Sequence, residues 1–215
     1  MKDSDRILEI INRLYQHYKP EMSLTYSNAW ELLVATMLSA QSRDERVNQV
    51  TKKLFSQYPT ISSFADAPLD SIETLVSSLN YYHTKAKHIK ETASRILTCF
   101  DGKVPETMEE LTSLPGVARK TANVVLNIAF HQSVGIVVDT HVLRLSTRLG
   151  IIHTHDRDQA EKELMACIPK KDWIAISLLL IHHGRAQCTA KKPLCQECYL
   201  QDLCPSNQLG REKIA

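Results

Sequence analysis

Apolar residues recur at helical spacing through most of this chain, and that pattern constrains the fold more than any other feature. Ile7, Ile10, Ile11 and Leu14 form one amphipathic stripe. Residues 32–38 are nearly all apolar, which predicts a buried central helix. Residues 136–138 have the β-branched content of a strand, but we interpret them as a buried connector because no similar segment is available to pair with them. The sequence therefore predicts an all-α fold.

Helix starts are predicted where a capping residue precedes an apolar run. Asn28, Asp70 and Thr107 each stand three residues before a glutamate, in the arrangement of a capping box. Asp44 is interpreted as a helix cap as well. Together with the apolar spacing, these signals predict helices at residues 28–38, 47–55, 70–79, 86–96, from 107 to the turn at 115, and 117–128, with Asp156, Asp158 and Asp172 beginning the later ones.

The length of 215 residues suits one large domain or two small ones. A formal net charge of +2 and an isoelectric point of about 8.2 do not by themselves indicate a nucleic-acid partner. Four of the first six residues are charged and no apolar signal segment is present there, and no apolar run has the length of a membrane span. We expect a soluble, cytoplasmic protein without a membrane partner.

A turn followed by a helix is the stretch that says most about chemistry. Pro115 and Gly116 form a strong turn signal, and apolar residues at helical spacing follow from Val117. A helix start presents backbone N–H groups and the positive end of the helix dipole, which favours a phosphate. Lys120 lies just inside this start, and Asp139 lies nineteen residues later at the head of another predicted helix. This combination suggests chemistry on a nucleic-acid backbone.

Each of these features also has a purely structural interpretation. The turn could join an ordinary helical hairpin, Lys120 could be a solvated lysine, and Asp139 could be an N-cap. A third and independent signal, near the C-terminus, favours the functional interpretation.

That signal is a group of four cysteines, Cys188, Cys195, Cys198 and Cys204, separated by six, two and five residues. Four thiols this close in a reducing compartment indicate a metal centre. A structural zinc site usually has two Cys-x2-Cys pairs and only one is present, whereas a [4Fe–4S] cluster tolerates uneven spacing. The spacing leaves both metals open. Cys99 and Cys167 stand apart and are interpreted as small apolar residues.

With these motifs the chain resembles the endonuclease III family, the bifunctional DNA glycosylases of the helix-hairpin-helix superfamily. The resemblance runs nearly end to end and includes residues 31–33, 39–41 and 183–185. It implies a six-helix barrel domain over residues 23–132, with the helix-hairpin-helix at about 107–127. Residues 1–22 and 133–215 would form a second helical domain, with DNA bound in the cleft between the two domains. The cysteine spacing matches the family's iron–sulfur loop over residues 188–204, which implies a [4Fe–4S] cluster.

The resemblance also implies a mechanism. The residue matching Lys120 attacks C1′ of a damaged nucleotide that has been flipped out of duplex DNA. The base leaves, a Schiff base forms, and β-elimination cuts the strand 3′ to the abasic sugar. The amine must be neutral to attack, so its pKa has to fall from about 10.4, while Asp139 stabilises cationic character at the sugar or moves a proton. The implied substrate is DNA with an oxidised pyrimidine or an abasic site, bound by a monomer.

Further residues are assigned to DNA contacts. The turn around Leu114, Gly116, Ala118 and Arg119 would hold a phosphate, which positions DNA without reading its sequence. By the resemblance, Gln41 fills the gap left by the flipped nucleotide, and Tyr81 stands where an apolar wedge meets the opposite strand. Lys191 and Lys192, inside the first cysteine loop, are interpreted either as phosphate contacts or as solvated side chains. His141 and Arg144 are assigned a supporting role for the helix that carries Asp139.

Two departures and two alternatives accompany this assignment. The family's turn reads Gly-Val-Gly, but Ala118 replaces its second glycine, and Asn80-Tyr81-Tyr82 replaces Gly-aliphatic-Tyr. Ala118 would weaken DNA binding if that position needs a positive φ. One alternative is a monofunctional adenine-mismatch glycosylase, which lacks the nucleophilic lysine. The other is a non-catalytic DNA-binding protein held together by structural zinc.

Overall fold

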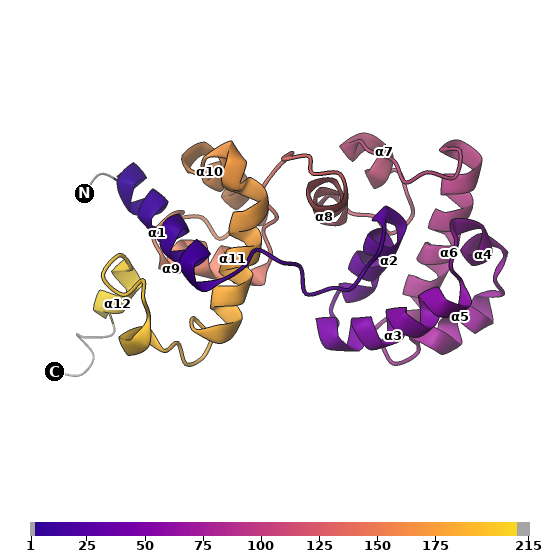
Figure 1. Cartoon of the computed structure of the whole chain (residues 1–215), viewed down its shortest axis with the longest axis horizontal. Coiled ribbons are helices and arrows are strands. Elements are labelled where there is room, and N and C mark those ends of the chain that lie inside the picture. Colours follow the sequence, from indigo (N-terminus) through magenta and orange to yellow (C-terminus); the bar gives the residue numbers. More distant parts are fainter. Residues whose placement is uncertain (1–2, 210–215) are drawn as a thin grey trace. The chain divides into compact units, whose positions relative to one another are not determined.

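The computed structural model describes residues 3–209, and all regular structure in this range is helical (Figure 1). The prediction of an all-α fold is confirmed. No helix within the described range is both long and apolar enough to cross a membrane. Contacts between residues divide the chain into a central unit, residues 22–132, and a terminal unit, which combines residues 3–21 with residues 133–209.

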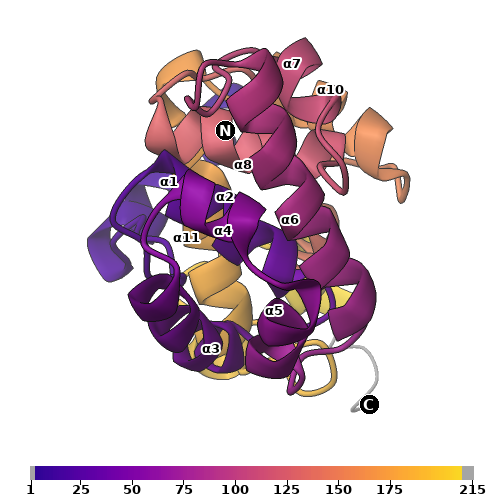
Figure 2. The ribbon, with the colours of Figure 1, turned by 90° about the vertical axis from the view of Figure 1, so that its right-hand side faces the viewer.

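The central unit is built from helices of 5 to 18 residues joined by short turns (Figure 2). In chain order they are α2 (Ala29–Ser39), α3 (Asp44–Gln57), α4 (Ile61–Asp66), α5 (Leu69–Val76), α6 (Tyr82–Cys99), α7 (Met108–Thr112) and α8 (Arg119–Ala129). The apolar spacing did not predict α4. Its signal is the cap, because Thr60 and Ser63 form a reciprocal capping box, with serine in place of the glutamate of the usual pattern.

The core of the central unit forms around α2. Leu33, Val34 and Leu38 of this helix are fully buried, as expected for a central helix that is apolar on most of its faces. α2 packs against α8, α3 and α6, and α6 runs alongside α4 and α5 (Figures 1 and 2). Phe64 of α4 packs edge-on against Trp30, with ring centroids 5.2 Å apart. This frame holds the turns that carry the candidate DNA contacts.

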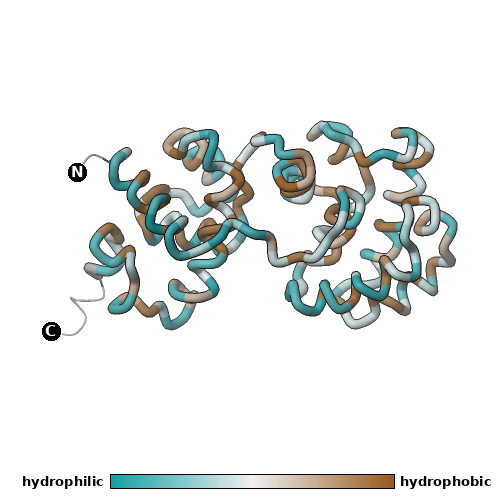
Figure 3. Tube along the Cα trace, in the orientation of Figure 1, coloured by the Kyte–Doolittle hydropathy of each residue, from teal (hydrophilic) through white to brown (hydrophobic). Residues whose placement is uncertain are grey.

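The terminal unit joins the first helix to the C-terminal part of the chain. Its helices are α1 (Asp3–His17), α9 (Thr140–Arg148), α10 (Arg157–Cys167) and α11 (Trp173–Ala186), with the short α12 (Pro205–Leu209) and 3-10 turns at Lys170–Asp172 and Cys195–Glu197. The apolar stripe of α1 packs in one core with α9, α10 and α11. Hydrophobic and hydrophilic stretches alternate along these helices, as the amphipathic pattern requires (Figure 3).

The local predictions have mixed outcomes. Residues 136–138 are a connector outside any helix or strand, with Ile136 and Val138 buried, as predicted. Thr107 caps α7 by accepting a hydrogen bond from the Glu110 N–H. Asp44 and Asp70 are not N-caps, because α3 begins at Asp44 itself and α5 already begins at Leu69; the N-cap positions are Arg43 and Pro68. An acidic residue interacts favourably with the helix dipole both at the N-cap and in the first turn. The sequence therefore does not distinguish a capping residue from the residues that follow it.

Candidate active site and metal centre

The turn between α7 and α8 needs glycine at one position. Gly116 has φ of +73°, and a Cβ there would lie 2.5 Å from Nδ1 of His88 and 2.8 Å from its Cβ. The turn is anchored from below, because the Thr92 hydroxyl of α6 donates to the Pro115 carbonyl oxygen at 2.8 Å. The tight turn therefore results from the left-handed backbone of Gly116 and its close contact with α6.

Ala118 departs from the family's glycine without cost to the backbone. It is the N-cap of α8, with φ −80° and ψ 162°, which is an extended conformation open to any residue. Its methyl group cannot accept a hydrogen bond from the first turn of α8, unlike the usual capping side chains. The helix start therefore suits an external acceptor such as a phosphate.

We predict opposite outcomes for substitutions at these two positions. G116A should destabilise the protein by about 1–2 kcal/mol through the backbone alone, and by more through the contact with His88. It should also weaken DNA binding, because the turn must move. A118G, the matched control two residues later, should change both quantities little. Thermal unfolding and fluorescence anisotropy with a duplex measure the two effects, and equal losses in the two variants would contradict this account.

Three assigned residues near this turn fall into two groups. Arg119 and Lys120 are the first two residues of α8, and both side chains are exposed. Leu114 differs, because its side chain is only 2% exposed and belongs to the core of the central unit. Its N–H donates to the Leu111 carbonyl oxygen and its own carbonyl oxygen accepts from Val117. The Leu114 side chain therefore stabilises the turn from inside, and the phosphate contact of this turn stays a prediction that concerns its backbone.

Asp139 is the N-cap of α9 in the terminal unit. Its Oδ1 atom accepts hydrogen bonds from the N–H groups of His141 and Val142, both at 2.8 Å. The structural interpretation of this residue is thus confirmed, and it is compatible with a second role because the two bonds use only one carboxylate oxygen. Lys120 and Asp139 lie in different units, so their joint action stays a prediction.

Gln41 and Tyr81 are brought together in the central unit. Both are exposed, and both are non-glycine residues with positive φ, +55° and +57°. Tyr81 is the N-cap of α6 and is 66% exposed, an unusual position for a large ring. The Asn80 side-chain amide donates to the Gln41 carbonyl oxygen at 2.7 Å, which joins the two turns. Strained backbone of this kind gathers at functional sites.

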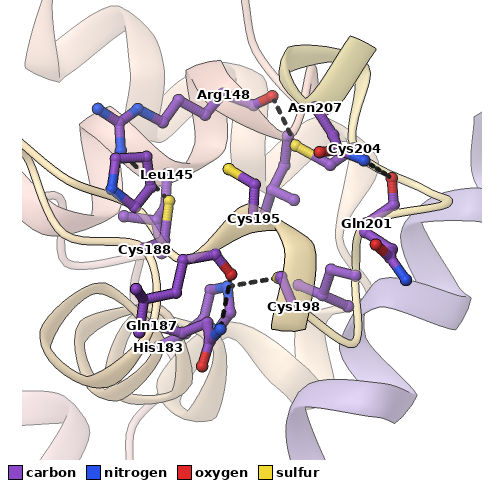
Figure 4. A pocket seen from close by; sticks show the side chains of 14 residues that line it. Leu145, Arg148, His183, Gln187, Cys188, Cys195, Cys198, Gln201, Cys204 and Asn207 are labelled. Carbon is purple, nitrogen blue, oxygen red and sulfur yellow. Dashed lines mark hydrogen bonds between the residues drawn. The ribbon is translucent and has the colours of Figure 1, made fainter. Parts of the chain in front are cut away.

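Cys188, Cys195, Cys198 and Cys204, the cysteine quartet, line one pocket in the terminal unit (Figure 4). A [4Fe–4S] cluster takes four cysteine thiolates and occupies the space between them with its own iron and sulfide atoms. The four thiols that line this pocket supply that set of ligands.

Two side chains lie within hydrogen-bond distance of sulfurs of the quartet. Arg148, at the end of α9, donates from Nη1 to the Cys188 sulfur at 3.3 Å, and its two terminal nitrogens also donate to the carbonyl oxygens of residues 189 and 190. His183 of α11 lies with Nε2 3.6 Å from the Cys198 sulfur, while its Nδ1 faces the hydroxyls of Tyr199 and Tyr18. In the tautomer whose Nδ1 accepts from one of these hydroxyls, the ring proton is on Nε2 and can be donated to a thiolate.

Burial sets the ionisation of these groups. It lowers the pKa of His183 to about 4, with a smaller contribution from His17, so the ring is neutral near pH 7. Burial also raises the pKa values of the Cys198 and Cys204 thiols. A bound metal centre reverses this effect, because thiolates are its ligands.

Sequence reasoning did not single out Arg148 or a role for His183 at the sulfurs. A basic residue at the C-terminal end of a helix usually just interacts favourably with the helix dipole. No sequence signal therefore indicates that Arg148 lies beside the cysteine quartet. The glycine in the motif of residues 183–185 has a packing reason, because a Cβ on Gly184 would lie 2.9 Å from Nδ1 of His141 and 3.1 Å from Nη2 of Arg144. Arg144 in turn donates to the Gly184 and Cys188 carbonyl oxygens, which agrees with its predicted supporting role.

Comparison with known proteins decides the family. The HhH-GPD superfamily of base excision DNA repair proteins matches residues 34–170, and the iron–sulfur binding domain of endonuclease III matches residues 188–204. The chain is 50% identical to endonuclease III of Synechocystis sp. over 202 residues, which cover 94% of this chain and 91% of the relative. The chain belongs to the endonuclease III family. Endonuclease III of Bacillus subtilis is 42% identical over 214 residues, across 99% of this chain and 96% of that one.

A solved endonuclease III, trapped as a covalent intermediate with DNA in an estranged-adenine complex, has the same fold. It superposes with a TM-score of 0.91 at 37% identity, covering 98% of this chain and all of that one. As a member of the endonuclease III family, the protein is a base excision repair DNA glycosylase and AP lyase with a [4Fe–4S] cluster. The adenine-mismatch and zinc-stapled alternatives are thereby set aside. The exposed Lys191 and Lys192 follow Cys188 in the iron–sulfur region, and their phosphate contacts stay a prediction.

Proposed function

We propose that this protein acts as a monomer on duplex DNA, removes oxidised pyrimidines, and cleaves the resulting abasic site through Lys120. The observation that carries the proposal is the position of Lys120. It is exposed on the first turn of α8, directly after the Gly116 turn and an N-cap residue whose side chain makes no hydrogen bond to the helix. A phosphate bound there would bring a neighbouring sugar within reach of the amine. The site of action is then the nucleoid DNA of the cytoplasm.

The reaction follows from the chemistry of an amine and an acetal carbon. The neutral amine of Lys120 attacks C1′ of the extruded nucleotide, and the bond from C1′ to the base breaks with its electron pair leaving on the base. Ring opening gives a Schiff base between C1′ and the lysine nitrogen. Loss of a proton from C2′ then expels the 3′ phosphate, which cuts the strand 3′ to the sugar. Because Lys120 is exposed, the desolvation that favours its neutral form must come from the bound DNA.

Asp139 is the proposed electrostatic partner of this step. Its Oδ1 atom is engaged at the start of α9, which fixes the carboxylate in one rotamer. The other oxygen would face the sugar, stabilise positive charge at C1′ and accept a proton.

The ligands of the cluster are proposed to be Cys188, Cys195, Cys198 and Cys204, which bound the iron–sulfur region. When bound, the cluster cross-links residues 188–204 and so shapes the loop with Lys191 and Lys192 for contact with a phosphate. No step of the base removal is assigned to it. We also propose the two domains that the resemblance implies, one over residues 23–132 and one that joins residues 1–22 to residues 133–215.

The test is incubation of the protein with a duplex that carries one thymine glycol, in the presence and absence of borohydride. We expect release of the base, strand cleavage 3′ to the lesion, and a covalent protein–DNA adduct when borohydride is present. An undamaged duplex is the control. Free base with an intact strand and no adduct would reduce the protein to a monofunctional glycosylase and overturn the proposal.

A substitution at Asp139 should separate its two roles. Asn ranks with Asp as an N-cap, so D139N should keep the melting temperature close to that of the wild type. It removes the charge, so the single-turnover rate of base release should fall by about 10²- to 10⁴-fold. D139A is the comparison, because it should lose the rate and also about 1 kcal/mol of stability. A wild-type rate in D139N would show that Asp139 is a helix cap and nothing more.

A further inference from the structure

Lys85 is a buried lysine that connects two candidate DNA-contacting turns. It lies in the first turn of α6 with only 7% of its surface exposed. Its ammonium group donates to the carbonyl oxygens of Leu38 and Ala40, at 2.8 and 2.7 Å, and to the Ser42 hydroxyl at 3.1 Å. These three acceptors come from the end of α2 and the loop on either side of Gln41.

The number of bonds matches the chemistry of the group. An ammonium has three N–H donors and no acceptor, and here each donor has one partner. The carbonyl oxygens of Leu38 and Ala40 lie at the negative end of the α2 dipole, which favours a cation. Burial lowers the pKa of Lys85, while the three oxygen acceptors around its nitrogen are the partners that an ammonium group requires. With its nitrogen engaged in this way, Lys85 is not available as a second nucleophile.

The same residue is bonded to the other turn. The backbone N–H of Lys85 donates to the Tyr81 carbonyl oxygen at 3.0 Å, in the first turn of α6. Asn80 supplies a second connection through its amide bond to the Gln41 carbonyl oxygen. Lys85 thus bonds to the residues on either side of Gln41 and to the backbone of Tyr81, and Asn80 bonds to the backbone of Gln41. Gln41 and Tyr81 both have a positive φ, which these hydrogen bonds must maintain.

We propose that Lys85 is a positioning residue that locks Gln41 and Tyr81 into one rigid unit, which enters the duplex when a nucleotide is extruded. The inference rests on the proposed function, because it takes duplex DNA with an extruded nucleotide as the substrate. Its physical basis is preorganisation. Two exposed side chains that insert between stacked nucleobases must keep their positions. A rigid backbone beneath them lowers the entropy cost of ordering them during insertion.

The chain offers a matched control on the same helix. Lys90 lies five residues after Lys85 in α6, and its ammonium group also donates to two backbone carbonyl oxygens, those of Ala65 and Ala67. These belong to the end of α4 and the turn after it, away from Gln41 and Tyr81. K90M therefore removes the same kind of bond from the same helix without touching the proposed unit.

The experiment compares K85M, N80A and K90M with the wild type in the full-length protein. Base release is measured under single-turnover conditions on a thymine glycol duplex, and borohydride trapping is measured on a single-stranded abasic oligonucleotide. The second substrate needs Lys120 but no extrusion from a base stack. Hydrogen exchange of residues 38–46 reports on the loop itself. N80A alters an exposed side chain, so it remains informative if K85M does not fold.

We expect K85M to slow release from the duplex by about tenfold or more while trapping on the single strand is retained, with faster exchange in residues 38–46. N80A should show the same pattern to a smaller degree, and K90M should lose thermal stability with no change in the ratio of the two activities. Equal ratios in K85M, N80A and K90M, with a wild type that excises the lesion, would overturn this inference alone. A wild type that releases no base would overturn the proposed function and this inference together.

Discussion

Replacing Lys120 with alanine is expected to abolish the covalent adduct with a thymine glycol duplex and to lower the rate of strand cleavage by about 10³-fold or more. The reason is chemical, because an adduct that borohydride can trap requires a primary amine at C1′. The side chain is exposed at the start of α8, so its removal should leave the fold intact. Gel separation of the adduct and a thermal melt measure the two expectations.

A second variant separates binding from reaction. K120R keeps a positive charge beside the proposed phosphate site but has no amine that can form the Schiff base. It should bind the damaged duplex with an affinity close to that of the wild type and form no adduct. R119A, next to Lys120 on α8, controls for loss of charge and should bind more weakly while still forming the adduct. Trapped adduct in K120A at the wild-type level would show that another amine is the nucleophile.

Replacing Cys198 with alanine is expected to remove the cluster and to unfold the segment that it holds. Cys198 lines the pocket with the other three cysteines of the quartet, and burial raises the pKa of its thiol. A buried thiolate without its metal is unfavourable, so ligand loss and local unfolding should be coupled, as in other structural metal sites where binding contributes about 10 kcal/mol or more. The expected result is loss of the brown colour, of bound iron and of the cooperative thermal transition.

The matched control for this variant is C167A. Cys167 is half-buried at the end of α10 and does not line the pocket of the quartet. Its removal should cost no more than a small packing change and leave the iron content unchanged. Iron and acid-labile sulfide per protein, measured with the visible spectrum, distinguish the two cases. A full complement of iron in C198A would show that this cysteine is not a ligand.

Several parts of the fold and site are visible in the sequence because they depend on neighbouring residues. Helical spacing of apolar side chains identifies the first helix and the central α2, and Thr107 identifies the start of α7. Gly116 is predictable for the same reason, since the need for a positive φ in a tight turn is local. The cysteine spacing likewise indicates a metal centre, although the kind of metal centre required the resemblance to the family.

Other features depended on which segments pack together. Leu114 belongs to a motif that suggests contact with DNA, yet its side chain faces the core because α7 and α8 close over it. α4 is six residues long, too short for apolar periodicity to reveal it. The effect of Ala118 was left open by the sequence and could be judged only from its backbone angles, because its negative φ shows that this position does not need glycine.

The sequence by itself determined the all-α class, the turn at Gly116 and the cysteine quartet, because each follows from local backbone preferences or from residues close in the chain. The tertiary structure decided the roles of Lys85, Arg148 and His183, whose partners lie between 15 and 47 positions away. A lysine, an arginine or a histidine has the same local preferences whether it is solvated or buried. Its partners are set by how the helices pack, and that depends on the whole core.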